Sequence, residues 1–165
     1  MVKKTLAMRL LEGKKIAYEA VNYDASERDA EKIAGQLNVP PEQLFKTLVV
    51  AAPTNGRPAK PLLLVIPANR QLDLKKAARL VNVKKVKMAT HQQAEAMTGL
   101  QVGGISPLAL VNKGFTIFLD VAALEQAKIF VSAGERGTQI KLSPKDLSKV
   151  VGARLADLCV GLADE

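Results

Sequence analysis

The chain of 165 residues has one cysteine, one histidine, no tryptophan and only 4% aromatic residues. The single cysteine, Cys159, excludes an intrachain disulfide and favours a reducing compartment. One histidine and one cysteine, far apart in the sequence, are too few to supply the nitrogen and sulfur ligands of a zinc site. Neither a P-loop nor a dinucleotide-binding glycine pattern is present. We therefore expect no metal and no cofactor.

The same scarcity bears on nucleophilic catalysis. Cys159 lies in the apolar stretch 155–160 and is expected to be a buried, inert thiol. A Ser-His-Asp triad would require His91, which is predicted in the first turn of a helix, where a polar surface role is the simpler interpretation. An enzyme with this sequence would work without a triad and without a His- or Cys-based nucleophile.

Long apolar runs are also missing. The longest, residues 62–68, is far shorter than the roughly 18 residues of a membrane-spanning helix. Residues 1–11 combine lysines with a short apolar run and no small-residue cleavage signal, which predicts a helix rather than a signal peptide. Hydrophobic residues make up 48% of the chain and charged residues 24%, which is typical of a globular protein. We expect one cytoplasmic domain over residues 1–165, with no membrane association.

What the chain does contain is an uneven distribution of positive charge. The net charge is +8; residues 1–90 carry 17 Lys and Arg against 8 Asp and Glu, and residues 91–165 carry 7 against 8. Within 70–87, seven basic side chains are opposed only by Asp73. A solvated surface without a partner more often mixes the two signs. The excess of basic residues either contacts a polyanion such as RNA or contributes only to general solubility, and both interpretations stay open.

Capping and turn signals divide the chain into alternating helices and short strands. Ser26 is predicted to cap a helix that reaches Leu37, and Asp73, Thr90 and Ser143 are predicted to cap three others. Asn-Gly between two apolar runs predicts a hairpin turn at 53–58. The expected helices span 4–12, 26–37, 73–81, 90–99 and a last one from 143; the expected strands span 16–23, 44–52, 62–66, 83–89, 115–119, 128–132 and 138–142. This pattern predicts a mixed α/β (α+β) domain but does not fix the strand order.

Lys46 stands inside the apolar strand predicted at 44–52. Strand alternation places it on the same face as Leu48 and Val50. Because a charged group on an apolar stripe is costly to bury, Lys46 either extends its ammonium to solvent at the strand end or holds an anion. The residues alone leave both possibilities open.

Two glycine-bearing loops are candidates for ligand contact. In residues 102–107 (Val-Gly-Gly-Ile-Ser-Pro), the paired Gly103 and Gly104 allow close backbone approach to a ligand and present N–H groups, and Pro107 stiffens the exit. Residues 132–137 (Ser-Ala-Gly-Glu-Arg-Gly) form a second loop after a predicted strand. Each loop taken alone is more typical of a plain turn.

In combination with the Phe-Lys-Thr strand at 45–47 and the stretches 71–76 and 84–89, these loops resemble the YbaK/EbsC family, which is related to the editing domain of bacterial prolyl-tRNA synthetases. Order and spacing match from about residue 6 to residue 158. The resemblance implies a curved, barrel-like mixed sheet flanked by helices, with a cleft for the 3′ aminoacyl-adenosine of a tRNA. It implies a catalytic role for Lys46, Gly103 and Gly104. It implies substrate contacts by Tyr23, Thr47, Ile105, Ser106, Pro107, Ser132 and Gly134.

The implied activity is trans-editing, in which a mischarged amino acid is removed from tRNA without a metal. Cys-tRNA(Pro) ranks first as substrate, its own thiol attacking the ester, and Ala-tRNA(Pro) ranks second. Backbone amides at 103–105 would stabilise the oxyanion, and Lys46 would neutralise the terminal phosphate. The acceptor stem would contact the basic segment through its phosphates, at Lys75, Lys76, Arg79, Lys84, Lys85 and Lys87.

Two departures from the family pattern bear on specificity: the link from Tyr23 to Lys46 is a few residues shorter, and Gln139 stands where many relatives carry an acid. The implied partners are aminoacylated tRNA and a prolyl-tRNA synthetase, and DNA is not expected. Two other classes stay open on the residues: a non-catalytic tRNA-binding module, and a small-molecule binder that uses the same glycine loop.

Overall fold

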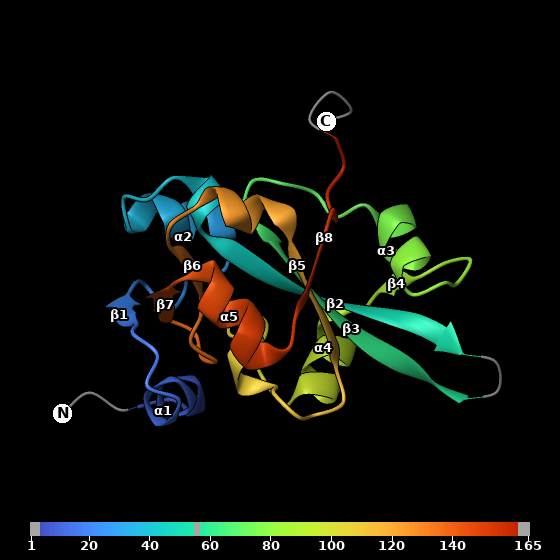
Figure 1. The fold of residues 1–165 in the computed structure, drawn as a ribbon, viewed down its shortest axis with the longest axis horizontal. Coiled ribbons are helices and arrows are strands. Elements are labelled where there is room, and N and C mark those ends of the chain that lie inside the picture. Colours follow the sequence, from blue (N-terminus) through green and yellow to red (C-terminus); the bar gives the residue numbers. More distant parts are fainter. Residues whose placement is uncertain (1–3, 55–56, 162–165) are drawn as a thin grey trace.

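The computed structural model describes residues 4–54 and 57–161, and within them the strands form two open sheets (Figure 1). The larger sheet has the order β4-β2-β3-β5-β8, with bounds Lys87–Met88, Phe45–Thr54, Arg57–Pro67, Thr116–Asp120 and Arg154–Ala156. The smaller sheet has the order β1-β7-β6, with bounds Glu19–Asn22, Thr138–Leu142 and Ile129–Ser132. A single parallel bridge between Leu44 and Phe130 links the two sheets.

The helices lie around these sheets (Figure 1). The α-helices are α1 (Leu6–Gly13), α2 (Ala30–Gln36), α3 (Leu74–Leu80), α4 (His91–Thr98) and α5 (Pro144–Val151). Three 3-10 helices complete the list: η1 (Pro41–Gln43), η2 (Pro107–Ala109) and η3 (Val121–Glu125). Within the described ranges, no helix has both the length and the hydropathy needed to cross a bilayer. The predicted mixed α/β architecture is confirmed, except that neither sheet closes into a barrel-like form.

The middle of the larger sheet is the second half of β3. Its run Leu62–Ile66 is buried on both faces: Leu63 and Val65 pack into one hydrophobic cluster, and Leu62, Leu64 and Ile66 into another. A continuous apolar run is what a strand covered on both sides requires. β3 pairs antiparallel with β2 and parallel with β5. The long hairpin formed by β2 and β3 projects from this core (Figure 1). The expected turn residues Asn55 and Gly56 lie outside the described residues.

Three of the four predicted helix caps are confirmed. The Asp73 carboxylate accepts from the backbone N–H of Lys75 and Lys76, and Thr90 forms a capping box with Gln93. Ser143 caps α5, with a proline at its first position. The prediction for Ser26 was wrong, because its hydroxyl donates to the Asp24 carboxylate at 2.7 Å instead. The helix starts later, at Ala30.

The cap of that helix is Asp29, whose carboxylate accepts from the Glu31 N–H at 2.9 Å. Aspartate and serine are equally good cap residues, so local preference did not separate them. The strand predicted at 83–89 is also shorter: only Lys87–Met88 pair with β2, at Ala51 and Val50. Strand β8 was not predicted, because it forms by pairing with β5 far away in the sequence.

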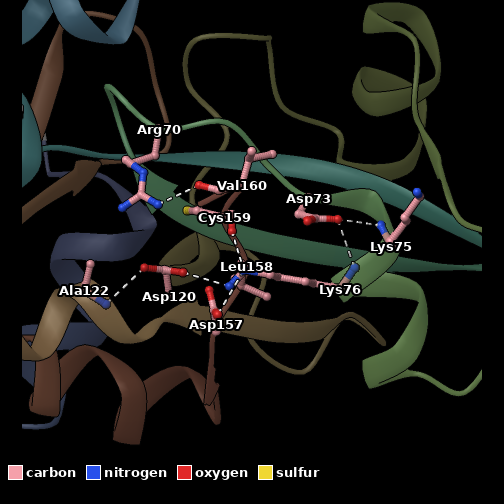
Figure 2. Close-up of polar contacts among 10 residues, drawn as sticks. All are labelled: Arg70, Asp73, Lys75, Lys76, Asp120, Ala122, Asp157, Leu158, Cys159 and Val160. Atoms are coloured by element: carbon pink, nitrogen blue, oxygen red, sulfur yellow. Dashed lines mark hydrogen bonds and ion pairs between the residues drawn. The ribbon is translucent and has the colours of Figure 1, made fainter. Parts of the chain in front are cut away.

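The segment after β8 is fixed by polar contacts that Figure 2 shows in detail. The buried Asp120 accepts from the N–H groups of Leu158 at 2.9 Å and Ala122 at 3.0 Å. Arg70 donates to the Val160 carbonyl at 2.7 Å. Burial, with the nearby Asp120 carboxylate as a further cause, raises the pKa of the Cys159 thiol to about 12. Cys159 is therefore a buried and unreactive thiol, as predicted.

Candidate active site

A cleft of about 230 Å³ opens where the first half of β2, helix α2, helix α4 and the 102–105 segment meet strands β6 and β7. Its walls are mostly apolar, and its polar side chains are few, which is the usual character of a small-molecule site. The predicted residues that line it are Lys46, Thr47, Gly103, Ile105 and Ser132. The structure thus brings together the strand lysine, the first glycine loop and the start of the second.

The charged side chains around the cleft are all basic. Among the described residues that line it, Arg28, Lys46 and His91 are cationic or able to become so, and none is Asp or Glu. Lys46 is partly buried, and its ammonium donates to the Ala68 carbonyl at 3.2 Å. An ammonium has three donors, so two remain for a ligand. Such a lining favours an anionic ligand group near Lys46.

The position of Lys46 follows from the strand pairing. It is the second residue of β2 and pairs with Ile66 in the register of β2 and β3. Its neighbour Phe45 is buried in the main core and holds the strand in place. The lysine side chain therefore extends from a strand that the core holds in place. It donates to the Ala68 carbonyl and lines the cleft.

The backbone of the 102–106 loop presents two N–H groups without a partner at residues that line the cleft. The Val102 N–H donates to the Glu95 carboxylate at 2.8 Å, and the Gly104 N–H donates to the Gln101 carbonyl at 2.8 Å. Within the described chain, the N–H groups of Gly103 and Ile105 make no hydrogen bond. Both residues line the cleft. They are the amides of this loop that can receive a developing negative charge.

Gly104, which was predicted together with Gly103, lies away from the cleft. It is buried, it does not line the cleft, and its N–H is engaged in the turn. A Cβ at this position would lie 2.9 Å from the Glu135 Cα and 3.0 Å from the Arg136 N. Glycine is therefore required here because the two glycine-bearing loops pack backbone against backbone.

The floor of the cleft carries a buried, neutral polar pair. Ser132 on β6 and Gln139 on β7 are register partners, and they are 7% and 4% exposed. The Ser132 hydroxyl oxygen accepts from the Gly134 N–H at 3.1 Å. The Gln139 Oε1 is buried and has no hydrogen-bond partner. An unsatisfied buried acceptor costs about 1–3 kcal/mol, so this position favours a ligand that brings a donor.

Four predicted site residues lie away from the cleft lining, in addition to Gly104. Ser106 is fully buried and caps η2, and Pro107 is buried beside it. Gly134 borders a second hollow next to α1. Tyr23 does not line the cleft, but it packs against the hydrophobic cluster that contains the lining residues Ile33 and Leu44. Its hydroxyl is buried without a partner.

Sequence reasoning missed three polar lining residues: Arg28, His91 and Gln139. Arg28 lies just before α2, two residues after Ser26, at which the sequence predicts the helix cap. His91 is exposed in the first turn of α4, as predicted, yet it also borders the cleft. Gln139 was noted for its identity but had no assigned role. No local pattern marks these three, because distant segments bring them together.

The basic segment leads directly to this cleft. Lys84, Lys85 and Lys87 are exposed, and the following residues Met88, Ala89 and His91 line the cleft. On α3, Lys75 and Arg79 are exposed as well.

Lys76 differs from the other predicted tRNA contacts, because its ammonium binds the Asp157 carboxylate at 2.9 Å and the Cys159 carbonyl at 2.7 Å (Figure 2). It anchors the C-terminal segment, and its charge is already paired.

Comparison with known proteins places these features in a family context. Residues 24–150 match the family model described as the aminoacyl-tRNA editing domain. EbsC of Enterococcus faecalis, a proposed Cys-tRNA(Pro)/Cys-tRNA(Cys) deacylase, is 38% identical over 157 residues, which cover 94% of this chain and 93% of EbsC. A proline–tRNA ligase of Nitratidesulfovibrio vulgaris is 28% identical over 111 residues, 67% of this chain but 18% of the ligase.

Solved structures show the same relationship. The crystal structure of a proposed trans-editing enzyme for prolyl-tRNA synthetase superposes with a TM-score of 0.78 at 27% sequence identity. The match covers 97% of this chain and 100% of that one.

Proposed function

Because the chain belongs to the aminoacyl-tRNA editing domain family and, within it, to the YbaK/EbsC group, we propose that it is a trans-editing deacylase for mischarged tRNA. The observation that supports this most directly is the cleft itself. Its charged lining is wholly basic among the described residues, two unpaired amides border it, and an exposed basic segment leads to its edge. These features suit a ligand with a phosphate at one end and an ester carbonyl further in.

The chemistry demands little of the protein, because an aminoacyl ester is already activated. In the proposed reaction the carbonyl oxygen of the ester, as it gains negative charge, accepts from the N–H groups of Gly103 and Ile105. One such donor typically lowers the barrier by about 3 kcal/mol. The Lys46 ammonium holds the terminal phosphate and fixes the ester relative to the loop.

For a cysteinyl substrate, the nucleophile is the thiol of the substrate. Its sulfur attacks the ester carbonyl carbon, the bond from that carbon to the ribose oxygen breaks, and the thiol proton ends on the ribose hydroxyl. The products are a thiolactone and uncharged tRNA. For an alanyl substrate, water attacks the same carbon and the products are alanine and uncharged tRNA.

Cys-tRNA(Pro) is the first candidate substrate and Ala-tRNA(Pro) the second. The name of EbsC supports the first. The unpaired Gln139 Oε1 on the cleft floor also favours a substrate that brings an additional donor, such as the cysteinyl thiol. The proposal includes a cytoplasmic location, the whole of 1–165 as one editing domain, and a prolyl-tRNA synthetase as partner, since such ligases contain a similar segment.

The test is a panel of charged tRNAs: Cys-tRNA(Pro), Ala-tRNA(Pro), Cys-tRNA(Cys) and Pro-tRNA(Pro). We expect catalytic loss of the ester for Cys-tRNA(Pro), with cognate Pro-tRNA(Pro) spared. Binding of every tRNA without loss of any ester would favour the non-catalytic module and refute the deacylase.

A further inference from the structure

The side chain of Arg136 fixes the peptide that joins Val102 to Gly103. Its Nε donates to the Val102 carbonyl at 2.8 Å. The described chain has no cis peptide, so in this peptide unit the carbonyl and the following N–H point in opposite directions. Since the Val102 carbonyl faces Arg136, the Gly103 N–H faces away from it. This is the N–H that makes no hydrogen bond within the described residues and belongs to a residue that lines the cleft.

The neighbouring peptides are fixed as well. The Val102 N–H is bound by Glu95 from α4, and the Gly104 N–H closes a turn on Gln101. Between them, Gly103 has a φ of +93°, a conformation that glycine adopts at no steric cost. These contacts fix the peptides on both sides. The orientation of the peptide between Val102 and Gly103 therefore depends on the hydrogen bond from Arg136.

Arg136 is itself held by the second glycine-bearing loop. The Ala133 N–H donates to the Thr138 carbonyl at 3.1 Å, and the backbone at Glu135 and Arg136 packs on Gly104. The loop is therefore attached by its backbone both to strand β7 and to the first glycine-bearing loop. Arg136 and Val102 are 34 residues apart in the sequence, so the hydrogen bond between them fixes the position of one loop relative to the other.

We propose that Arg136 is a positioning residue: through the Val102 carbonyl it aims the Gly103 N–H into the cleft, toward the oxyanion of the scissile ester. The inference rests on the proposed deacylase function. This positioning role requires the Nε–H donor of Arg136, and a positive charge alone is not sufficient for it. Lysine places a methylene where arginine has Nε, so Arg136→Lys retains the charge and loses the contact.

The experiment measures kcat and KM for Cys-tRNA(Pro), and Kd for uncharged tRNA(Pro), in the wild type, Arg136→Lys and Arg136→Ala. Misplacing one oxyanion donor should lower kcat about tenfold or more in both variants. We expect KM and Kd for Arg136→Lys to stay within about twofold of the wild type. Added guanidinium should partly restore kcat in Arg136→Ala. Arg154→Lys, an exposed arginine on β8, is the matched control and should leave all three constants unchanged.

The outcomes separate the two proposals. If the wild type cleaves no charged tRNA, the function itself is refuted. If the wild type is active and Arg136→Lys keeps its full kcat, the positioning role is refuted. A variant that loses tRNA affinity with kcat intact would instead make Arg136 a phosphate contact, again against the inference.

Discussion

Ser132 and Gln139 face each other as register partners on β6 and β7, and both line the floor of the cleft. One of the two is satisfied: the Ser132 oxygen accepts from Gly134, whereas the Gln139 Oε1 has no partner. The pair thus leaves one buried acceptor without a partner in the lining of the cleft.

Gln139→Leu tests this acceptor. The substitution removes an unsatisfied buried group, so we expect the free energy of unfolding to rise by about 1 kcal/mol. Loss of the acceptor should at the same time raise KM for Cys-tRNA(Pro) by roughly five- to tenfold. Urea denaturation and steady-state kinetics measure the two effects. Gln92→Leu, on the exposed surface of α4, is the control. An unchanged KM would mean that the substrate makes no use of this oxygen.

Lys46→Ala tests the anion-binding role of the strand lysine. We expect kcat/KM for Cys-tRNA(Pro) to fall roughly 100-fold, because a hydrogen bond to a charged group contributes about 1.5–3 kcal/mol. The fold should persist, since the side chain is partly buried and makes one hydrogen bond, to the Ala68 carbonyl. Circular dichroism and kinetics check the two statements, with the exposed Lys113→Ala as control. Full activity in Lys46→Ala would remove this lysine from the mechanism.

The three exposed lysines beside the cleft should contribute through phosphate contacts. We expect the triple variant Lys84→Ala, Lys85→Ala, Lys87→Ala to bind uncharged tRNA more weakly. The slope of log affinity against log salt should become shallower by roughly 2–3. Lys76→Ala should behave differently: it should lower the unfolding free energy with little change in the salt slope, because its ammonium binds Asp157 and the Cys159 carbonyl. Equal effects on the slope would contradict this division of roles.

The Cys159 thiol predicts a pH dependence of stability. Burial raises its pKa to about 12, above the ordinary value, so the folded protein keeps the proton when the unfolded chain releases it. The contribution of this group is fully present below the ordinary thiol pKa and is lost as the pH rises from there to about 12.

Two measurements check this. Native protein at pH 8 should resist thiol reagents until it is unfolded, and Cys159→Ala should weaken the alkaline decline in unfolding free energy relative to the wild type. Rapid labelling of the native protein would show that the thiol is accessible and that the burial argument fails.

Features that depend on neighbouring residues could be predicted from the amino-acid sequence. The caps at Asp73, Thr90 and Ser143 act within one helical turn, and the run 62–66 carries its own requirement for a strand covered on both faces. Lys46 and the 102–107 loop could be identified because an unusual residue or a glycine pair stands out within its own segment. The family resemblance, which depends on the spacing of such segments, is confirmed by the match over residues 24–150.

Which of these residues come into contact could be learned from the folded chain alone. Arg28, His91 and Gln139 join the cleft from the segment before α2, from α4 and from β7, and no local pattern places them there. The same holds for Gly104, which is needed for loop packing, and for Lys76, which binds the C-terminal segment. The physical reason is that hydrogen bonds and close contacts between distant segments depend on strand order and register. Those are set by burial of the whole core, to which each residue contributes only a part.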